Sequence, residues 1–195
     1  MLNEASCSPL IRLARGIDIM NEHIGRTVAW LVLAMVLVQF VVVLLRYTFG
    51  VGSLFLQESI VYLHATMFML GAGYTFLHGQ HVRVDVFYRE ASEHRKAMVD
   101  LAGVIFFLLP VCALITIYGW PYVSKSWAVL EGSKETSGIP AVFILKTAIL
   151  FFAVLMALQG ISLALKSYFR IRGKSMALST ENKTEKISIK QEYSD

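Results

Sequence analysis

Residues Thr27–Leu45 read TVAWLVLAMVLVQFVVVLL, nineteen consecutive positions without a charged side chain. An α-helix needs roughly 20 apolar residues to cross a hydrocarbon core about 30 Å thick, so this stretch is long enough to span a bilayer. The stretch is continuously apolar, whereas the strands of a transmembrane β-barrel alternate apolar and polar residues. It therefore predicts a transmembrane helix at 27–45 and argues against a barrel.

Three further stretches have the same character. Their predicted boundaries are about 59–77, 98–120 and 141–165. Hydrophobic residues make up 56% of the 195-residue chain and charged residues only 16%, whereas soluble domains carry about a quarter charged residues. We therefore expect an all-α integral membrane protein in which residues 1–172 form one domain with four transmembrane helices. The polar tail at 173–195 is expected to be disordered and cytoplasmic.

The segment before the first span is amphipathic. Its apolar residues recur every three or four positions at Leu10, Leu13, Ile17, Met20 and Ile24, as in a helix with one apolar face. We predict an N-terminal interfacial helix that lies on the membrane surface. An ordinary leader into the first span is the alternative. A cleaved signal peptide is not expected, because the apolar stretch begins only after 26 residues.

Positive charge is distributed unevenly between the predicted loops. Fourteen Lys and Arg residues lie before the first span, between the second and third, or after the fourth, whereas Arg46, Lys125 and Lys134 lie on the opposite side. Because cytoplasmic loops carry the excess of positive charge, both termini are expected in the cytoplasm. Residues 47–58 and 121–140 would then face outward. Anionic lipids are the expected partners of the cytoplasmic cations.

Four polar side chains lie within the predicted spans or at their ends. Arg46 closes the first span, Glu58 opens the second, His64 lies inside the second, and Lys146 is the only charged residue of the fourth. Charges at such depths are costly unless they are paired or solvated. We predict that Glu58 pairs with Arg46 or Lys146, and that His64 is hydrogen-bonded between helices. A proton relay would need more ionisable groups near the midplane.

No familiar catalytic or cofactor-binding motif is present. The sequence has no GxSxG, HExxH, Walker or GxGxxG motif and no CxxC pair. A haem held by two histidines needs imidazoles on facing helices, and His64 is the only histidine within a span. We therefore expect no catalytic residue, no metal, no cofactor and, with a net charge of only +4, no nucleic-acid partner. A membrane anchor of a redox enzyme complex is the alternative function.

Small residues and prolines predict how two of the helices pack. Gly71 and Gly73 lie inside the second span, where they would let a neighbouring helix approach closely. The third span contains Pro110 and continues towards Trp120 and Trp127. We expect a long third helix, bent near Pro110, whose outer end carries aromatic residues at the interface.

Several short motifs occur together in this chain. "VLLRYTFG" ends the first span, Glu58 opens the second, the segment His81-Val82-Arg83-Val84-Asp85 follows it, and Gly138-Ile139-Pro140 precedes the fourth. With these spacings and four spans, residues 17–172 resemble the small membrane subunit, of the DctQ type, of tripartite ATP-independent periplasmic (TRAP) transporters.

This resemblance implies a multi-pass protein of the bacterial cytoplasmic (inner) membrane that works with two partners. A periplasmic binding protein would capture an organic acid, and a large membrane subunit would move it inward with sodium ions while the small subunit braces the stationary part of the large one. The family-motif loop would comprise His81, Arg83 and Asp85. Possible contacts to the binding protein are Lys125, Trp127, Lys134 and Glu135.

Overall fold

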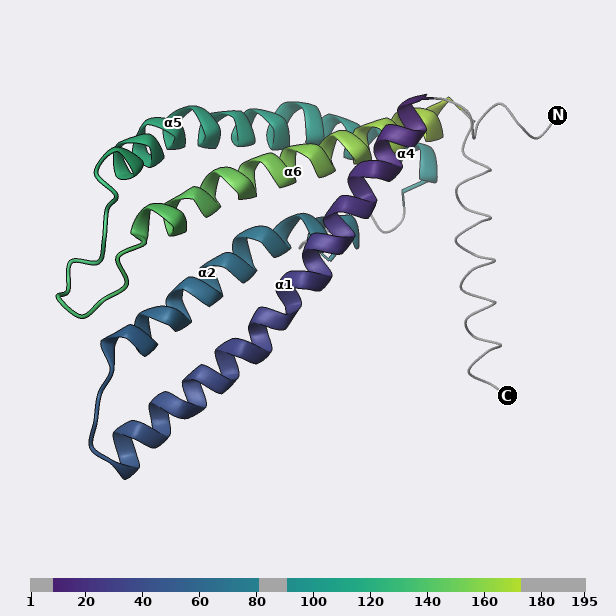
Figure 1. Cartoon of the computed structure of the whole chain (residues 1–195). Coiled ribbons are helices and arrows are strands. Elements are labelled where there is room, and N and C mark those ends of the chain that lie inside the picture. The colour runs from purple at the N-terminus through teal and green to yellow at the C-terminus, as the bar shows by residue number, and fades with distance from the viewer. Residues whose placement is uncertain (1–8, 81–90, 173–195) are drawn as a thin grey trace, which may run out of the picture.

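The computed structural model describes residues 9–80 and 91–172, which form long helices joined by short loops (Figure 1). The helices are α1 (Pro9–Thr48), α2 (Leu54–Leu77), α4 (Glu93–Gly103), α5 (Leu109–Ala128) and α6 (Val142–Ile171), with a π-helical segment, η2 (Val104–Leu108), between α4 and α5. No strand occurs in the two described ranges. The motif loop with His81, Arg83 and Asp85 lies outside them, as does the tail at 173–195.

The four predicted spans are confirmed as helices. Within residues 9–80 and 91–172, four helical stretches are long and apolar enough to cross a membrane, namely α1, α2, the continuous stretch Glu93–Ala128 and α6. The expected spans at 27–45, 59–77, 98–120 and 141–165 coincide with them to within a residue or lie inside them. Each observed helix is longer than its predicted span, because polar residues at its ends are also helical.

Helix α1 is a single rod of 40 residues. At 1.5 Å per residue it is about 60 Å long, twice the thickness of a bilayer core. The amphipathic stretch before residue 27 is continuous with the first span, so a separate interfacial helix is not confirmed. Its buried residues Ala14, Ile17 and Asn21 repeat every three or four positions. They face the other helices of the bundle, and polar groups on the same part of α1 bind α6.

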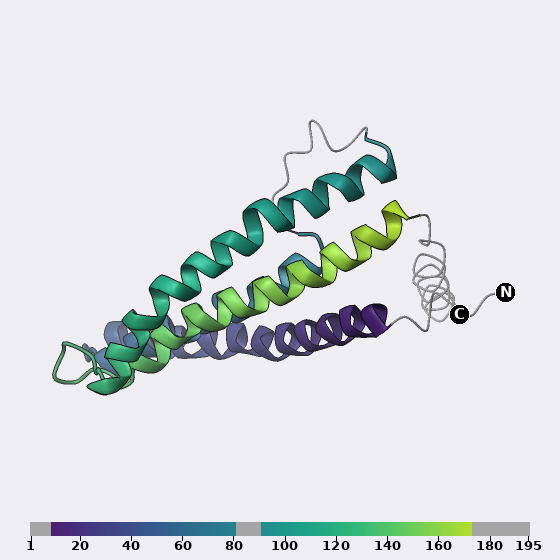
Figure 2. The same ribbon diagram turned by 90° about the horizontal axis from the view of Figure 1, so that it is seen from above.

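Helix α6 lies at the centre of the bundle. It packs against α1, α2, α4 and α5, and Figure 2 shows it between α5 and α1. Several of its eight buried residues are small, including Ala148, Ala153, Gly160 and Ser162. Small side chains let helix backbones approach one another closely. Helix α2 lies beside α1 and also contacts α6.

The two ends of the bundle differ. The start of α1 and the end of α6 lie at one end of the bundle (Figure 1), which we call the terminal end. The loops at 49–53 and 129–141 lie at the opposite end, which we call the loop end. The side of the membrane that the terminal end faces remains a prediction from the charges.

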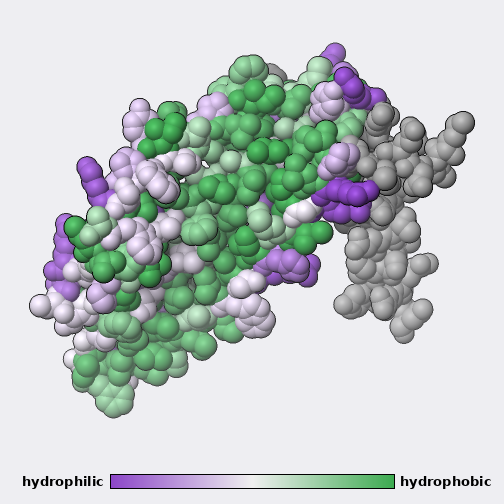
Figure 3. Space-filling model, turned by 45° about the horizontal axis from the view of Figure 1, so that its top comes forward, coloured by the Kyte–Doolittle hydropathy of each residue, from purple (hydrophilic) through white to green (hydrophobic). Residues whose placement is uncertain are grey.

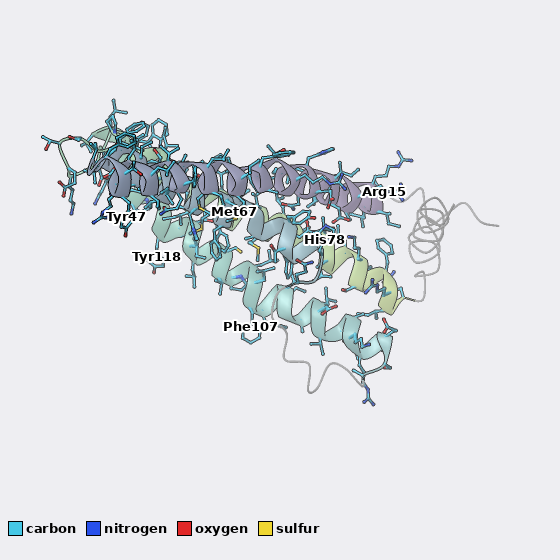
Figure 4. The ribbon with its side chains drawn as sticks, turned by 90° about the horizontal axis from the view of Figure 1, so that it is seen from below. Arg15, Tyr47, Met67, His78, Phe107 and Tyr118 are labelled. Carbon is cyan, nitrogen blue, oxygen red and sulfur yellow. The ribbon has the colours of Figure 1, made fainter. Side chains whose placement is uncertain are left out.

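Most large apolar side chains lie on the surface. Figure 3 shows a broad apolar band across the visible face, with hydrophilic residues gathered mainly towards its ends. Phe107 and Tyr118 project away from the neighbouring helices (Figure 4) and are exposed. Continuous apolar surface of this size needs lipid or a partner to cover it.

The third span is one helical stretch that passes through a π-helical segment. Pro110 lacks an N–H group and its ring would clash with the carbonyl of the residue four positions earlier. The wider turns of η2 directly precede this proline and accommodate it. Helix α6 provides room for η2, since a Cβ atom at Gly160 would lie 2.5 Å from Leu108 Cδ2. The stretch continues to Ala128, which confirms the long third helix.

Helices α1 and α2 approach one another closely near the terminal end. A Cβ atom at Gly25 would lie 2.2 Å from Tyr74 Cγ, and one at Gly73 would lie 2.4 Å from Asn21 Oδ1. The packing role predicted for Gly73 is thereby confirmed, whereas a Cβ atom at Gly71 would meet only Val28 at an ordinary 3.8 Å.

We expect Gly25→Ala to destabilise the protein, because the ring of Tyr74 cannot move away without separating α1 from α2. Gly16→Ala is the matched control. It lies in the same helix with nothing within 4 Å of the added Cβ atom, and alanine favours a helix by up to about 1 kcal/mol over glycine. Thermal unfolding of both variants in detergent measures the difference. Equal unfolding temperatures would contradict the close approach of α1 and α2.

Candidate functional site

Polar side chains inside the bundle gather in two clusters, one at each end. The terminal cluster joins α1 to α6 and consists of Asp18, Asn21, Gln159, Ser162 and Lys166. The loop cluster joins α2, α5, α6 and the loop between α5 and α6, and consists of Glu58, Ser126, Glu131, Ser133, Ile139 and Lys146.

Asp18 is the centre of the terminal cluster. Its Oδ1 atom accepts hydrogen bonds from Ser162 Oγ at 2.7 Å and from Gln159 Nε2 at 3.0 Å. Its Oδ2 atom forms an ion pair with Lys166 Nζ. The fully buried Asn21 donates from Nδ2 to Gln159 Oε1 at 2.7 Å. The three α6 residues are three and four positions apart and therefore share one face of the helix, so the first half of α1 is bound along that face.

None of the terminal-cluster residues is identified as a site residue from the sequence. Gln159 and Ser162 are uncharged, so they do not interrupt the predicted span. Their spacing was nevertheless a usable signal, because two polar residues three positions apart in an apolar helix lie on one face and need partners in a membrane.

A more exposed contact lies next to the terminal cluster. Glu22 of α1 binds His78 Nε2 at 2.8 Å and Arg26 Nε at 2.7 Å through its two oxygens. The ring of Tyr74 packs against His78 with centroids 4.4 Å apart. These contacts attach the last turn of α2 to α1.

Glu58 holds the loop between α5 and α6 against the start of α2. Its Oε1 atom accepts a hydrogen bond from Ser133 Oγ at 2.5 Å, and its Oε2 atom accepts one from the backbone N–H of Ile139 at 2.6 Å. A Cβ atom at Gly138 would lie 2.2 Å from Ser133 Oγ and 2.7 Å from Glu58 Oε1. The Gly138-Ile139-Pro140 motif therefore has a structural reason, since only glycine fits beside this carboxylate.

Lys146 binds Glu131, a carboxylate that is not among the predicted site residues. Its Nζ atom lies 2.5 Å from Glu131 Oε2, which also accepts a hydrogen bond from Ser126 Oγ at 2.7 Å. The same Nζ atom lies 4.1 Å from the centroid of the Tyr122 ring, a distance suited to a cation–π contact.

The predicted pairing of Glu58 with Arg46 or Lys146 is wrong. In the described ranges Glu58 binds Ser133 and Ile139 instead, while Lys146 binds Glu131. The physical reason is the path of the loop between α5 and α6. It folds back over the helix ends and brings its own donors and a carboxylate within reach. Arg46 lies exposed near the end of α1.

His64 also differs from its prediction, because hydrogen bonding between helices is not confirmed. The side chain is exposed and lines an open groove. Its ring lies nearly parallel to that of Phe68, with an interplanar angle of 8° and centroids 6.2 Å apart.

The four residues suggested as periplasmic contacts are exposed at the loop end, and one of them also has a packing role. Trp127 donates from Nε1 to Thr147 Oγ1 at 2.8 Å and packs edge-on against Phe143. Lys125, Lys134 and Glu135 are exposed. They add charge of both signs to this surface.

The described ranges contain no group of three or more His, Cys, Asp or Glu side chains that could hold a metal ion. The geometry of the two clusters is that of helix attachment, since every carboxylate in them accepts hydrogen bonds from donors on another element.

Comparison with known proteins identifies one family. The family model described as "Tripartite ATP-independent periplasmic transporters, DctQ component" matches residues 35–170. No curated protein and no solved structure matches the chain. The matched range contains the whole loop cluster, but Asp18 and Asn21 of the terminal cluster precede it.

Replacing Asp18 should weaken the attachment of α1 to α6. Asp18→Ala removes three contacts, and hydrogen bonds to charged groups contribute about 1.5–3 kcal/mol each when partners are lost. Glu93→Ala is the control, because Glu93 is highly exposed and its pair with Lys96 lies within one helix. We expect a clearly lower unfolding temperature for Asp18→Ala and nearly no change for Glu93→Ala. Similar values for both variants would contradict the role of the terminal cluster.

Acid should weaken the loop cluster. The hydrogen bond from Lys146, followed by that from Ser126, lowers the pKa of Glu131 below its ordinary value of 4.5. A carboxylate with a lowered pKa in the folded state stabilises the fold above its ordinary pKa, and this contribution is lost as the pH falls through the lowered value. The wild-type protein should therefore unfold at a higher temperature than Glu131→Gln at pH 7.

The difference should shrink as the pH falls below 4.5, because a protonated carboxyl and an amide are similar in shape and charge. Unfolding temperatures of both proteins across this range provide the measurement. A difference independent of pH would show that the charge of Glu131 contributes nothing.

Proposed function

The chain belongs to the DctQ component family of tripartite ATP-independent periplasmic (TRAP) transporters, and from this membership we propose that it is a non-catalytic scaffold for the large membrane subunit. In this proposal the large subunit carries out sodium-driven uptake of an organic acid, which a periplasmic binding protein delivers. The family match gives no support to a redox anchor.

The scaffold proposal rests on what the polar residues bind. The carboxylates and amides of both clusters bind other helices or the loop between α5 and α6. Between the clusters, His64 is the only His, Asp, Glu, Lys or Arg residue in the middle of the described spans. A path for an ion or a carboxylate through this subunit would need polar groups across the midplane. Transport is therefore assigned to the partner.

The shape of the subunit favours a bracing role. Helix α1 and the stretch Glu93–Ala128, of 40 and 36 residues, are about 60 and 54 Å long at 1.5 Å per residue. Both pack against α6, and polar contacts join the helices at both ends of the bundle. Helix α6 is attached to α1 at the terminal end and to α5 and its loop at the loop end, and such a central helix suits a part that stays in place while a transport domain moves.

We further propose that the terminal end faces the cytoplasm of a bacterial inner membrane. Arg12, Arg15, Arg170 and Arg172 belong to the helix ends there, where they can attract anionic lipids. The loop end then faces the periplasm, and Lys125, Trp127, Lys134 and Glu135 are offered to the binding protein.

Glu58 tests the scaffold proposal. Glu58→Ala removes both acceptors for the loop between α5 and α6, so we expect less folded protein, weaker co-purification of the large subunit, and sodium-driven uptake in vesicles that falls in the same proportion. Glu58→Gln should be milder because one oxygen can still accept a hydrogen bond. Glu135→Ala, an exposed acid in the same loop, controls for the loss of a negative charge in folding.

Comparing assembly with transport in Glu58→Ala distinguishes the scaffold role from a direct role in ion transport. Normal folding and assembly of Glu58→Ala together with a loss of sodium coupling would show a direct role in ion transport, and the scaffold proposal would then be wrong.

A further inference from the structure

An open groove lies midway along α2. Its volume is about 470 Å³, and its lining comprises Met35 of α1 and Ile60, Val61, His64, Ala65 and Phe68 of α2. Ile60, His64 and Phe68 are four positions apart, so the groove follows one face of the helix. Other α2 residues meet the rest of the bundle, since Glu58 binds the loop between α5 and α6 and Gly73 packs near Leu155 of α6.

His64 is a polar side chain in this otherwise apolar groove, and its ring nitrogens need hydrogen-bond partners. The residue lies near the middle of Leu54–Leu77 and is exposed. An imidazole has one hydrogen-bond donor and one acceptor when neutral, and no hydrogen bond joins this ring to the described residues, where its recorded contact is the stacking on Phe68. Hydrocarbon cannot satisfy these groups, and ionisable residues at this depth normally face protein or water.

The chemistry of the groove suits a transmembrane helix. Its apolar lining would accept either an acyl chain or a helix, but only a helix can bring a hydrogen-bonding side chain to the level of His64. Ala65 lies beside His64 in the groove, and a small residue at this position lets another helix approach closely.

We infer that this groove receives a transmembrane helix of the large membrane subunit, and that a polar side chain of this helix forms a hydrogen bond with His64. The inference rests on the proposed function and assigns one face of α2 to that partner. The His64 hydrogen bond fixes the depth of the incoming helix, while Met35, Ile60, Val61 and Phe68 supply its apolar contacts.

Photo-crosslinking from within the groove tests the location. A photoreactive amino acid replaces Ala65 in the full-length subunit, which is expressed with the large subunit in bacterial membranes. Ala113, an exposed alanine of α5, receives the same residue as a control. We expect crosslinks to the large subunit at least tenfold more abundant from position 65. A yield at 65 no greater than at 113, or crosslinks from 65 only to lipid or to a second copy of this chain, overturns the inference.

Substitution of His64 tests the hydrogen bond. His64→Leu should weaken co-purification of the large subunit roughly three- to tenfold, the effect of one hydrogen bond between membrane helices, and His64→Gln should restore most of it. The unfolding temperature of the isolated subunit should stay unchanged, because the ring lacks a hydrogen bond within the described chain. Destabilisation of the isolated subunit by His64→Leu, or unchanged co-purification, overturns the inference.

The outcome for the wild-type protein separates the two proposals. If the wild-type subunit binds the large subunit but position 65 gives no crosslink to it, only the groove assignment fails. If the wild-type subunit does not bind the large subunit at all, the proposed function fails and the inference fails with it.

Discussion

The Asp18 carboxylate sets the crossing on which the arrangement of the other helices depends. Donors from three residues of α6 converge on it, so the first half of α1 lies along α6. Helix α2 then packs beside α1, where Gly25 and Gly73 allow the backbones to approach. An apolar contact between membrane helices has little directional preference, because lipid tails are as apolar as leucine side chains. Directional polar contacts therefore determine which faces meet.

Polar contacts hold the helices together at the two ends of the subunit, whereas the middle is largely apolar. The loop cluster joins elements of the structure at one end, as Asp18 joins α1 to α6 at the other. Glu58 and Glu131 each accept hydrogen bonds from a different element. This division explains how a protein with few enclosed residues keeps a defined shape. It also leaves the middle free to face lipid or a larger partner, and His64 is an exposed ionisable side chain within that part of the described helices.

The sequence predicts the helices well because apolar length is a local property that each span carries by itself. It predicts the positions of Glu58, His64 and Lys146 along their helices for the same reason. It fails on their partners, because pairing depends on the path of the loop between α5 and α6, which brings Ser133, Ile139 and Glu131 to the helix ends. The direction in which His64 points follows from the crossing of α1 and α2, and no pattern within α2 alone reports it. The sequence does not predict the terminal cluster, because Asp18 and Gln159 are 141 positions apart.

This separation matters during biosynthesis. The chain is made from its N-terminus at about 5–20 residues per second, so α1, which ends at Thr48, is complete about 6–22 s before the ribosome reaches Gln159 and Ser162. Throughout this delay Asp18 and Asn21 lack the α6 groups that later bind them. Both residues precede the first apolar stretch, so water can hydrate them until α6 is inserted. The same residues ten positions later would lie in hydrocarbon without partners. The terminal cluster thus forms only when the last helix enters the membrane, so its formation marks the completed insertion of the four helices.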